Sequence, residues 1–137
     1  MIERQNIFPE GLSKRIVNGH LLYTPVVTVV PGKLVFVSGI LSRNAKGEIV
    51  GKGDMRAQIR QVFENIGAAL AAAGATMADI VKRQTFTTDI DSYFQHVDAR
   101  IEHGGDANST STTVEVRRLS HPDFLIEVEV MAVVPER

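Results

Sequence analysis

The stretch DMRAQIRQVFENIGAALAAAG, residues 54–74, decides the fold. Its apolar residues recur at the spacing of an amphipathic helix, and Asp54 and Gly74 are suited to cap the two ends. The apolar face consists of Met55, Ile59, Val62, Phe63, Ile66, Ala69, Leu70 and Ala73. A helix of about 20 residues is ~30 Å long, so its apolar face needs a broad partner, and a β-sheet is the natural one.

Alternating patterns and β-branched residues predict strands over residues 15–30, 34–37, 80–88, 112–119 and 124–134. Pro31-Gly32 predicts a turn between the first two strands. A short turn is predicted after Thr76, and a second helix from Asp91 or Ser92 to Gly104-Gly105. The resulting order, β-β-α-β-α-β-β, predicts one α+β domain over residues 1–137. We expect a mixed β-sheet with two helices packed on one face.

The last predicted strand has two different faces. Its even-numbered positions from Phe124 to Val130 are apolar, whereas its odd-numbered positions mix Leu125 and Met131 with glutamates. Two helices cover only one face of a sheet, and an uncovered face with aliphatic residues is typical of an oligomer interface. We therefore expect the face with Leu125, Glu127 and Met131 to contact other subunits.

The composition argues against several classes of function. The 15 basic and 16 acidic residues give a net charge of −1 without a basic stripe, so nucleic acid is not an expected partner. The absence of cysteine excludes disulfides, thiolate nucleophiles and cysteine-based metal sites. The four histidines, His20, His96, His103 and His121, lack metal-binding spacing, so no metal is expected. Without a signal-like N-terminus or a membrane-length apolar run, we expect a cytoplasmic protein that does not contact membranes.

Carboxylates and backbone groups remain as candidates for chemistry. Glu127 lies on a strand expected to be central, where burial would suit it to general base or acid catalysis. A purely structural pairing of Glu127 with a nearby arginine is the alternative. Ser38-Gly39 is suited to offering backbone groups to a ligand, or simply to ending a strand in a tight turn. Neither a nucleophile elbow nor a phosphate-binding loop is present.

Several short motifs follow one another along the chain. They are KLVFVSG (33–39), DMRAQ (54–58), ENI (64–66), DIVK (79–82), FTTD (86–89), TTVEV (112–116) and LIEVE (125–129). In this order they resemble the Rid (reactive intermediate deaminase, YjgF-type) family from about Gly19 to Pro135. The resemblance implies a chorismate-mutase-like α+β fold and a homotrimer with ligand clefts between subunits. It also implies hydrolysis of reactive enamines and imines without a metal or organic cofactor.

The resemblance further implies a set of site residues. Glu127 matches the glutamate that positions or activates water in the family, and Ser38 with Gly39 matches the Ser-Gly whose backbone completes the cleft. Thr112 and Thr113 match the start of the penultimate strand, which also contributes to substrate binding.

Two positions depart from the family pattern. Ser111 stands where the family has its substrate-binding arginine, and Val26 stands where it has an aromatic hydroxyl, with Tyr23 nearby but out of register. The chain therefore resembles a divergent member of the family. Because a hydroxyl does not replace a guanidinium charge, a substrate carboxylate is expected to bind poorly unless another arginine reaches the cleft. The candidates are Arg83, Arg117 and Arg118.

Two functions stay open at this point. The first is a small-molecule enzyme that hydrolyses or deaminates a C–N bond of an enamine- or imine-type substrate in a cleft between subunits, distinct from the usual 2-imino-acid activity. The second is a non-catalytic ligand-binding or regulatory trimer. Ribonuclease activity is sometimes attached to the family, but the near-neutral charge and the lack of a His/Lys constellation argue against it here.

Overall fold

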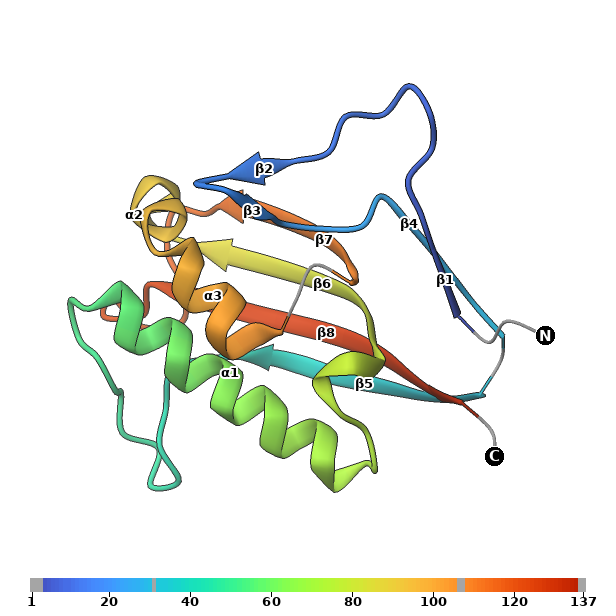
Figure 1. Ribbon diagram of the computed structural model, residues 1–137. Coiled ribbons are helices and arrows are strands. Elements are labelled where there is room, and N and C mark those ends of the chain that lie inside the picture. The colour runs from blue at the N-terminus through green and yellow to red at the C-terminus, as the bar shows by residue number, and fades with distance from the viewer. Residues whose placement is uncertain (1–3, 31, 106–107, 136–137) are drawn as a thin grey trace.

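The amphipathic stretch forms α1 (Met55–Ala72), which lies across one face of a four-stranded sheet (Figure 1). The computed structural model describes residues 4–30, 32–105 and 108–135. The strands of the sheet are, in spatial order, β5 (Gly32–Ile40), β8 (Ile126–Pro135), β6 (Ile80–Thr87) and β7 (Thr110–Glu115). The β6–β7 pair is parallel and the other two pairs are antiparallel. The predicted α+β class with a mixed sheet is thus confirmed.

The alternation predicted along the last strand is also confirmed. Ile126 and Val128 are fully buried on the side of α1, whereas Glu127, Glu129 and Met131 between and after them are only partly buried. The helical side of the core is formed by fully or almost fully buried residues of α1, namely Met55, Ile59, Val62, Phe63, Ile66 and Leu70.

The predicted ends of the first helix form as expected. The side chain of Asp54 accepts a hydrogen bond from the backbone N–H of Ala57 at 3.0 Å. Gly74, just beyond the helix, has a φ of +76°, a conformation that glycine adopts without steric cost. The turn after Thr76 is the 3₁₀ helix η1 (Met77–Asp79), which is closed by a capping box.

The second predicted helix is two helices, so the described residues form three α-helices. They are α2 (Ile90–Gln95) and α3 (Val97–Gly104), separated at His96. The first begins earlier than predicted, because the carboxylate of Asp89 accepts from the N–H of Ser92 and caps α2 there. Only α3 packs beside α1 on the sheet, and α2 lies at one end (Figure 1).

The N-terminal segment is not the single strand predicted over residues 15–30. It contains β2 (Ile16–Val17) and β3 (His20–Leu21), which pair as a hairpin, and then β4 (Val26–Val29). The turn between β2 and β3 is Asn18-Gly19, with φ angles of 51° and 80°, and Asn-Gly is the sequence that favours such a hairpin turn. β4 pairs with β1 (Arg4–Ile7), a strand that the sequence did not predict, rather than with β5. Pro31 of the predicted turn lies outside the described residues.

The last two strands are consecutive in the chain but are not neighbours in the sheet. β7 lies at the edge and β8 in the middle, with β6 between them. The segment at His121-Pro122-Asp123 is therefore a crossover turn, in which Phe124 N–H bonds to the carbonyl of His121 at 3.1 Å. β7 also ends at Glu115, before the predicted Leu119.

The sheet face opposite α1 and α3 carries exposed apolar side chains. Phe36 and Leu34 are 71% and 56% exposed, and Phe36 pairs in register with Met131. Met131 and Glu127 of β8 share this face, whereas Leu125 precedes β8 and packs against the core on the helical side. Among the residues that the structure describes, none of the helices has both the length and the hydrophobicity that crossing a bilayer requires.

Two glycines test how tightly the helical layer packs. A methyl group at Gly104 of α3 would stand 2.9 Å from ring carbons of Phe63, whereas one at Gly67 of α1 would meet only Met77 Cε at 3.7 Å. We expect Gly104→Ala to destabilise the fold by about 1–3 kcal/mol through overpacking. The matched change Gly67→Ala is expected to stabilise it by up to about 1 kcal/mol. Urea unfolding of both variants measures the difference, and equal effects would contradict it.

Candidate functional site

Glu127 is the carboxylate that the sequence singles out, and its pKa is raised. It is the second residue of β8 and projects from the open face of the sheet, half-buried. Burial, and secondarily the charge of Glu129 two residues along the same face, raise the pKa of the Glu127 carboxyl above its usual value. The structure gives it no ion pair with an arginine among the described residues.

A β-bulge brings the backbone of Ser38 and Gly39 to this carboxylate. Val37 pairs with Val130 and Ile40 with Val128, so two residues of β5 face a single residue of β8. A methyl group built on Gly39 would stand 2.7 Å from Oε2 of Glu127. The glycine is thus needed for close approach of the carboxylate, and not for a tight turn at the end of a strand. β5 continues through the bulge.

The chain after the bulge is held by the first helix. The amide Nδ2 of Asn65 on α1 donates to the carbonyls of Leu41 at 3.2 Å and of Arg43 at 2.8 Å. Asn65 in turn accepts from Nε2 of Gln61, one helical turn earlier, at 2.9 Å. These contacts tie the segment that leaves the bulge to a rigid element, which fixes where Gly39 meets Glu127.

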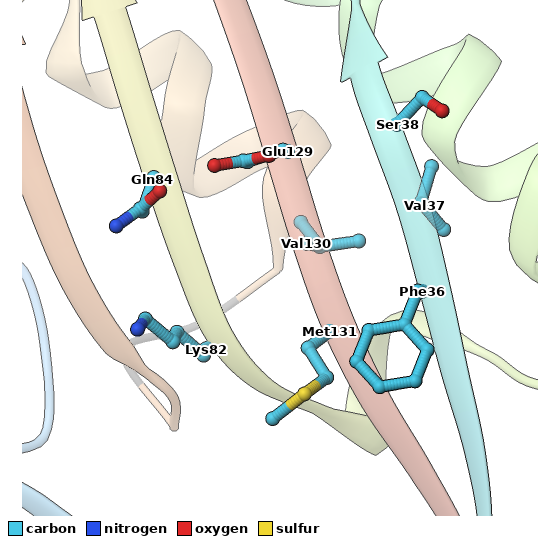
Figure 2. A pocket seen from close by; sticks show the side chains of 8 residues that line it. All are labelled: Phe36, Val37, Ser38, Lys82, Gln84, Glu129, Val130 and Met131. Carbon is cyan, nitrogen blue, oxygen red and sulfur yellow. The ribbon is translucent and has the colours of Figure 1, made fainter.

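A cavity of about 340 Å³ lies on the open face beside Glu129. Figure 2 shows its lining on three neighbouring strands: Phe36, Val37 and Ser38 on β5, Glu129, Val130 and Met131 on β8, and Lys82 and Gln84 on β6. The cavity therefore combines an apolar end at Phe36 and Met131 with a carboxylate, an amide and an ammonium group. Glu127 is not one of the residues that line this cavity; it lies on the same face of β8, two residues from Glu129.

The predicted residues of the penultimate strand divide between the two faces of the sheet. Register with β6 places Thr112 beside Gln84, on the open face, and Ser111 beside the buried Arg83, on the helical face. Ser111 and Thr113 line a second cavity, of about 270 Å³. Its other lining residues are Arg15, Leu22, Tyr23, Ile90, Tyr93, Phe94 and Arg100.

None of the three arginines considered from the sequence lines the cavity at Ser111. Arg83 is buried beneath the sheet, where Nε donates to Ser109 Oγ at 2.9 Å and Nη1 to the carbonyl of Gly104 at 3.0 Å. Arg117 and Arg118 line a separate depression with His121. The cations that do line it are Arg15, before the β2–β3 hairpin, and Arg100 on α3, and sequence reasoning missed both. The burial of Arg100 could have been predicted from the sequence, because a spacing of three residues from Val97 places Arg100 on the apolar stripe of its helix.

Val26 and Tyr23 end up in different surroundings. Val26 is on β4, opposite Ile7 and 38% exposed, and lines none of the cavities described above. Tyr23 lines the cavity with Ser111 and Thr113. Within one subunit, the structure therefore assembles two groups, Glu127 with Gly39 on the open face and Tyr23 with Ser111 and Thr113 on the helical face, and does not join them.

The histidines have structural contacts. Nδ1 of His96 lies 2.8 Å from the carbonyl of Ser92 at the end of α2, and Nδ1 of His121 accepts from the N–H of Asp123 at 3.0 Å. Over residues 4–30, 32–105 and 108–135, no three His, Asp or Glu side chains cluster as metal ligands would.

Sequence comparison relates the chain to one family. The family model described as endoribonuclease L-PSP matches residues 19–134. The RutC family protein YjgH of Escherichia coli K12 is 32% identical over an alignment of 142 residues that covers 100% of both chains. A RutC family protein of Pyrococcus horikoshii is 38% identical over 102 residues, which are 74% of this chain and 79% of that one.

Structural comparison agrees. A protein of unknown function of the conserved Rid family from Yersinia pestis, YyfB, matches with a TM-score of 0.80 at 28% identity, covering 97% of this chain and 100% of that one. A putative endoribonuclease from Thermotoga maritima matches with a TM-score of 0.69 at 35% identity, over 79% and 84% of the two chains. The expected chorismate-mutase-like α+β fold is thereby confirmed. The chain belongs to the YjgF/Rid family, the family of the matched endoribonuclease L-PSP model.

Proposed function

We propose that this protein is a homotrimeric enzyme that hydrolyses or deaminates the C–N bond of an enamine- or imine-type small molecule, with Glu127 as the general base. The observation that carries the proposal is the half-buried Glu127 carboxylate at the Gly39 bulge, whose pKa is raised. A raised pKa makes the carboxylate a stronger proton acceptor than an ordinary glutamate.

The proposed reaction needs only a positioned base and water. The Glu127 carboxylate takes a proton from water as the water oxygen attacks the carbon of the protonated imine, which gives a neutral carbinolamine. Glu127 then returns this proton to the nitrogen, the C–N bond breaks to release ammonia, and the hydroxyl proton of the carbonyl product passes back to the Glu127 carboxylate and on to solvent, which restores the proton that the imine had taken up. One imine and one water give one carbonyl compound and one ammonia, with no oxidant or reductant consumed. Donors at the bulge backbone of Ser38 and Gly39 are suited to orienting the reacting group.

The placement of the predicted residues supports a cleft between subunits. Glu127 with Gly39 and Ser111 with Thr113 project from opposite faces of one sheet, so a cleft that unites them draws on two chains. Because Ser111 stands where the family has arginine, the proposed substrate differs from the usual 2-imino acids. The exposed apolar face with Phe36 and Met131 supports an interface, since large apolar patches are rarely left to water.

The first test is the pH dependence of imine or enamine hydrolysis. We expect Glu127→Gln to abolish the activity without lowering the melting temperature, because the amide keeps the shape and removes a partly desolvated charge.

Activity of wild type should be lost as the pH falls through the raised pKa of Glu127, because the base becomes protonated. Glu129→Gln removes the neighbouring negative charge, lowers the pKa of Glu127, and should move this acidic limb to lower pH.

Hydrolysis is measured by ammonia release from a panel of imines and enamines with and without a carboxylate. A Glu127→Gln protein as active as wild type would leave the non-catalytic trimer as the better explanation. An acidic limb that does not move in Glu129→Gln would show that another group titrates.

The second test concerns the bulge. In Gly39→Ala the new methyl collides with Oε2 of Glu127, and the flexible end of the glutamate should swing away. We expect kcat to fall by roughly tenfold or more, since a 1 Å misplacement costs on that order, with the melting temperature nearly unchanged. Ser38→Ala is the matched control, because it keeps the backbone of the bulge, and it should retain most activity. The reverse ranking of the two variants would argue against a role for the backbone.

The third test is the oligomeric state. Light scattering after size exclusion should give three times the 15.0 kDa chain mass. Phe36→Lys, on the open face, should dissociate the trimer because it places a charge in an apolar interface. The exposed Ala68 of α1 lies on the helical side, and Ala68→Lys should leave the mass unchanged. A wild-type monomer at micromolar concentration would refute the assembly.

A further inference from the structure

Asn18 combines an exposed side chain with a following glycine. It forms the turn of the β2–β3 hairpin together with Gly19, and the two residues have φ angles of 51° and 80°. Both residues are exposed, and a methyl group built on Gly19 would meet no heavy atom within 4 Å. Within the described part of the chain, the side chain of Asn18 makes no hydrogen bond. Nothing in one subunit therefore holds its amide group in place.

An asparagine followed by glycine can react without an enzyme, because the glycine nitrogen approaches the side chain without obstruction from a Cβ atom. The backbone nitrogen of Gly19 attacks Cγ of Asn18, the C–N bond of the side-chain amide breaks, and ammonia leaves with the proton of the Gly19 nitrogen. The product is a cyclic imide. Water opens it to aspartate by attack at Cγ, or to isoaspartate by attack at the backbone carbonyl carbon. The sum is that asparagine and water give an acidic residue and ammonia.

The hairpin that holds this turn is short. The reaction requires rotation about the backbone of Asn18, which the closed turn resists, so the hairpin must open first. Its strands pair through Ile16 with Leu21 and through Val17 with His20. Ile16 is 60% exposed, so it adds little apolar burial to the pairing. A small two-stranded hairpin is marginally stable in water, and its local opening costs less free energy than opening of the central sheet.

The other asparagines of the chain, at positions 6, 44, 65 and 108, are followed by residues that have side chains. Asn44 is exposed like Asn18, but its amide oxygen accepts from the N–H groups of Lys46 and Glu48, both at 3.0 Å. Asn65 lies within α1, and its amide donates to two backbone carbonyls. These contacts hold the amide groups away from the following nitrogen, so the structure favours reaction at Asn18.

We propose that Asn18 is a site of spontaneous deamidation to isoaspartate and aspartate, and that isoaspartate at this position disrupts the β2–β3 hairpin. Isoaspartate leads the backbone through the side-chain carbon and lengthens the turn by one methylene group. Because loop length fixes the register of a hairpin, the pairs of β2 with β3 no longer fit. The N–H of Leu22 then loses its bond to the carbonyl of Arg15, which is 3.1 Å long. The modification goes beyond the proposed reaction, because Glu127 takes no part in it.

The experiment is incubation of the whole wild-type protein at mildly alkaline pH, followed by isoelectric focusing and peptide mass mapping. Conversion of the neutral amide to a carboxylate changes the net charge from −1 to −2, so a more acidic band should grow. Mapping should place the modification at Asn18 first, and a protein-isoaspartate methyltransferase should label the aged protein. Asn18→Gly keeps a favoured hairpin turn and should lose both the acidic band and the label. Asn44→Ser is the matched control and should age like wild type.

Hydrogen exchange measures the effect on the hairpin. The N–H of Leu22 should exchange faster in the aged protein than in fresh protein, whereas the amides of the central strand β8 should stay protected. The proposal is overturned if Asn18 stays unconverted, if another asparagine converts first, or if Asn18→Gly gives the same acidic band. Labelled protein in which Leu22 exchanges as slowly as before would also overturn it, because the hairpin would then tolerate isoaspartate.

Discussion

The alternation of side chains along β8 is the constraint on which the rest of the structure depends. Because successive residues of a strand point to opposite faces, burial of Ile126 and Val128 against α1 forces Glu127 and Glu129 onto the other face. A slip of one residue would place two carboxylates in the core, at a prohibitive cost in desolvation. The interaction that fixes the core therefore also fixes where the glutamates lie.

Position in the sheet then determines the chemistry of Glu127. β8 has strands on both sides, so its open face is partly shielded even without a covering layer. That shielding raises the pKa of the Glu127 carboxyl, and the second glutamate on the same face raises it further. The bulge at Ser38-Gly39 brings backbone instead of a side chain against the carboxylate. Glu127 has no ion pair with the described residues, and a carboxylate of this kind takes up a proton more readily than an ion-paired one.

Sequence patterns predicted the parts of the fold that depend on local periodicity. The helix from Met55, its Asp54 cap and the two faces of the last strand follow from the spacing of neighbouring residues. The pairing of β7 with β6 instead of β8 could not be predicted in this way, because it depends on contacts between segments that are distant in the sequence. The dipeptide Asn18-Gly19 is a local hairpin signal that the prediction of a single strand over residues 15–30 did not use. It forms the turn of the β2–β3 hairpin. The absence of a side chain at Gly39 is explained by the close approach of Glu127, which lies on a different strand.

The burial of Arg100 shows why a lost charge is hard to trace in sequence. It lies on the apolar stripe of α3, three residues from Val97, and it is buried beside a cavity that the β2–β3 hairpin segment, α2 and β7 also line. The cavity beside Ser111 is lined by residues of several elements, so a guanidinium reaches it from α3 and from the segment before β2. Arginine is suited to such a change, because its long side chain spans the distance and its charge does not depend on burial. A site of this kind is therefore defined by the charge in the cavity, and not by the position that carries it.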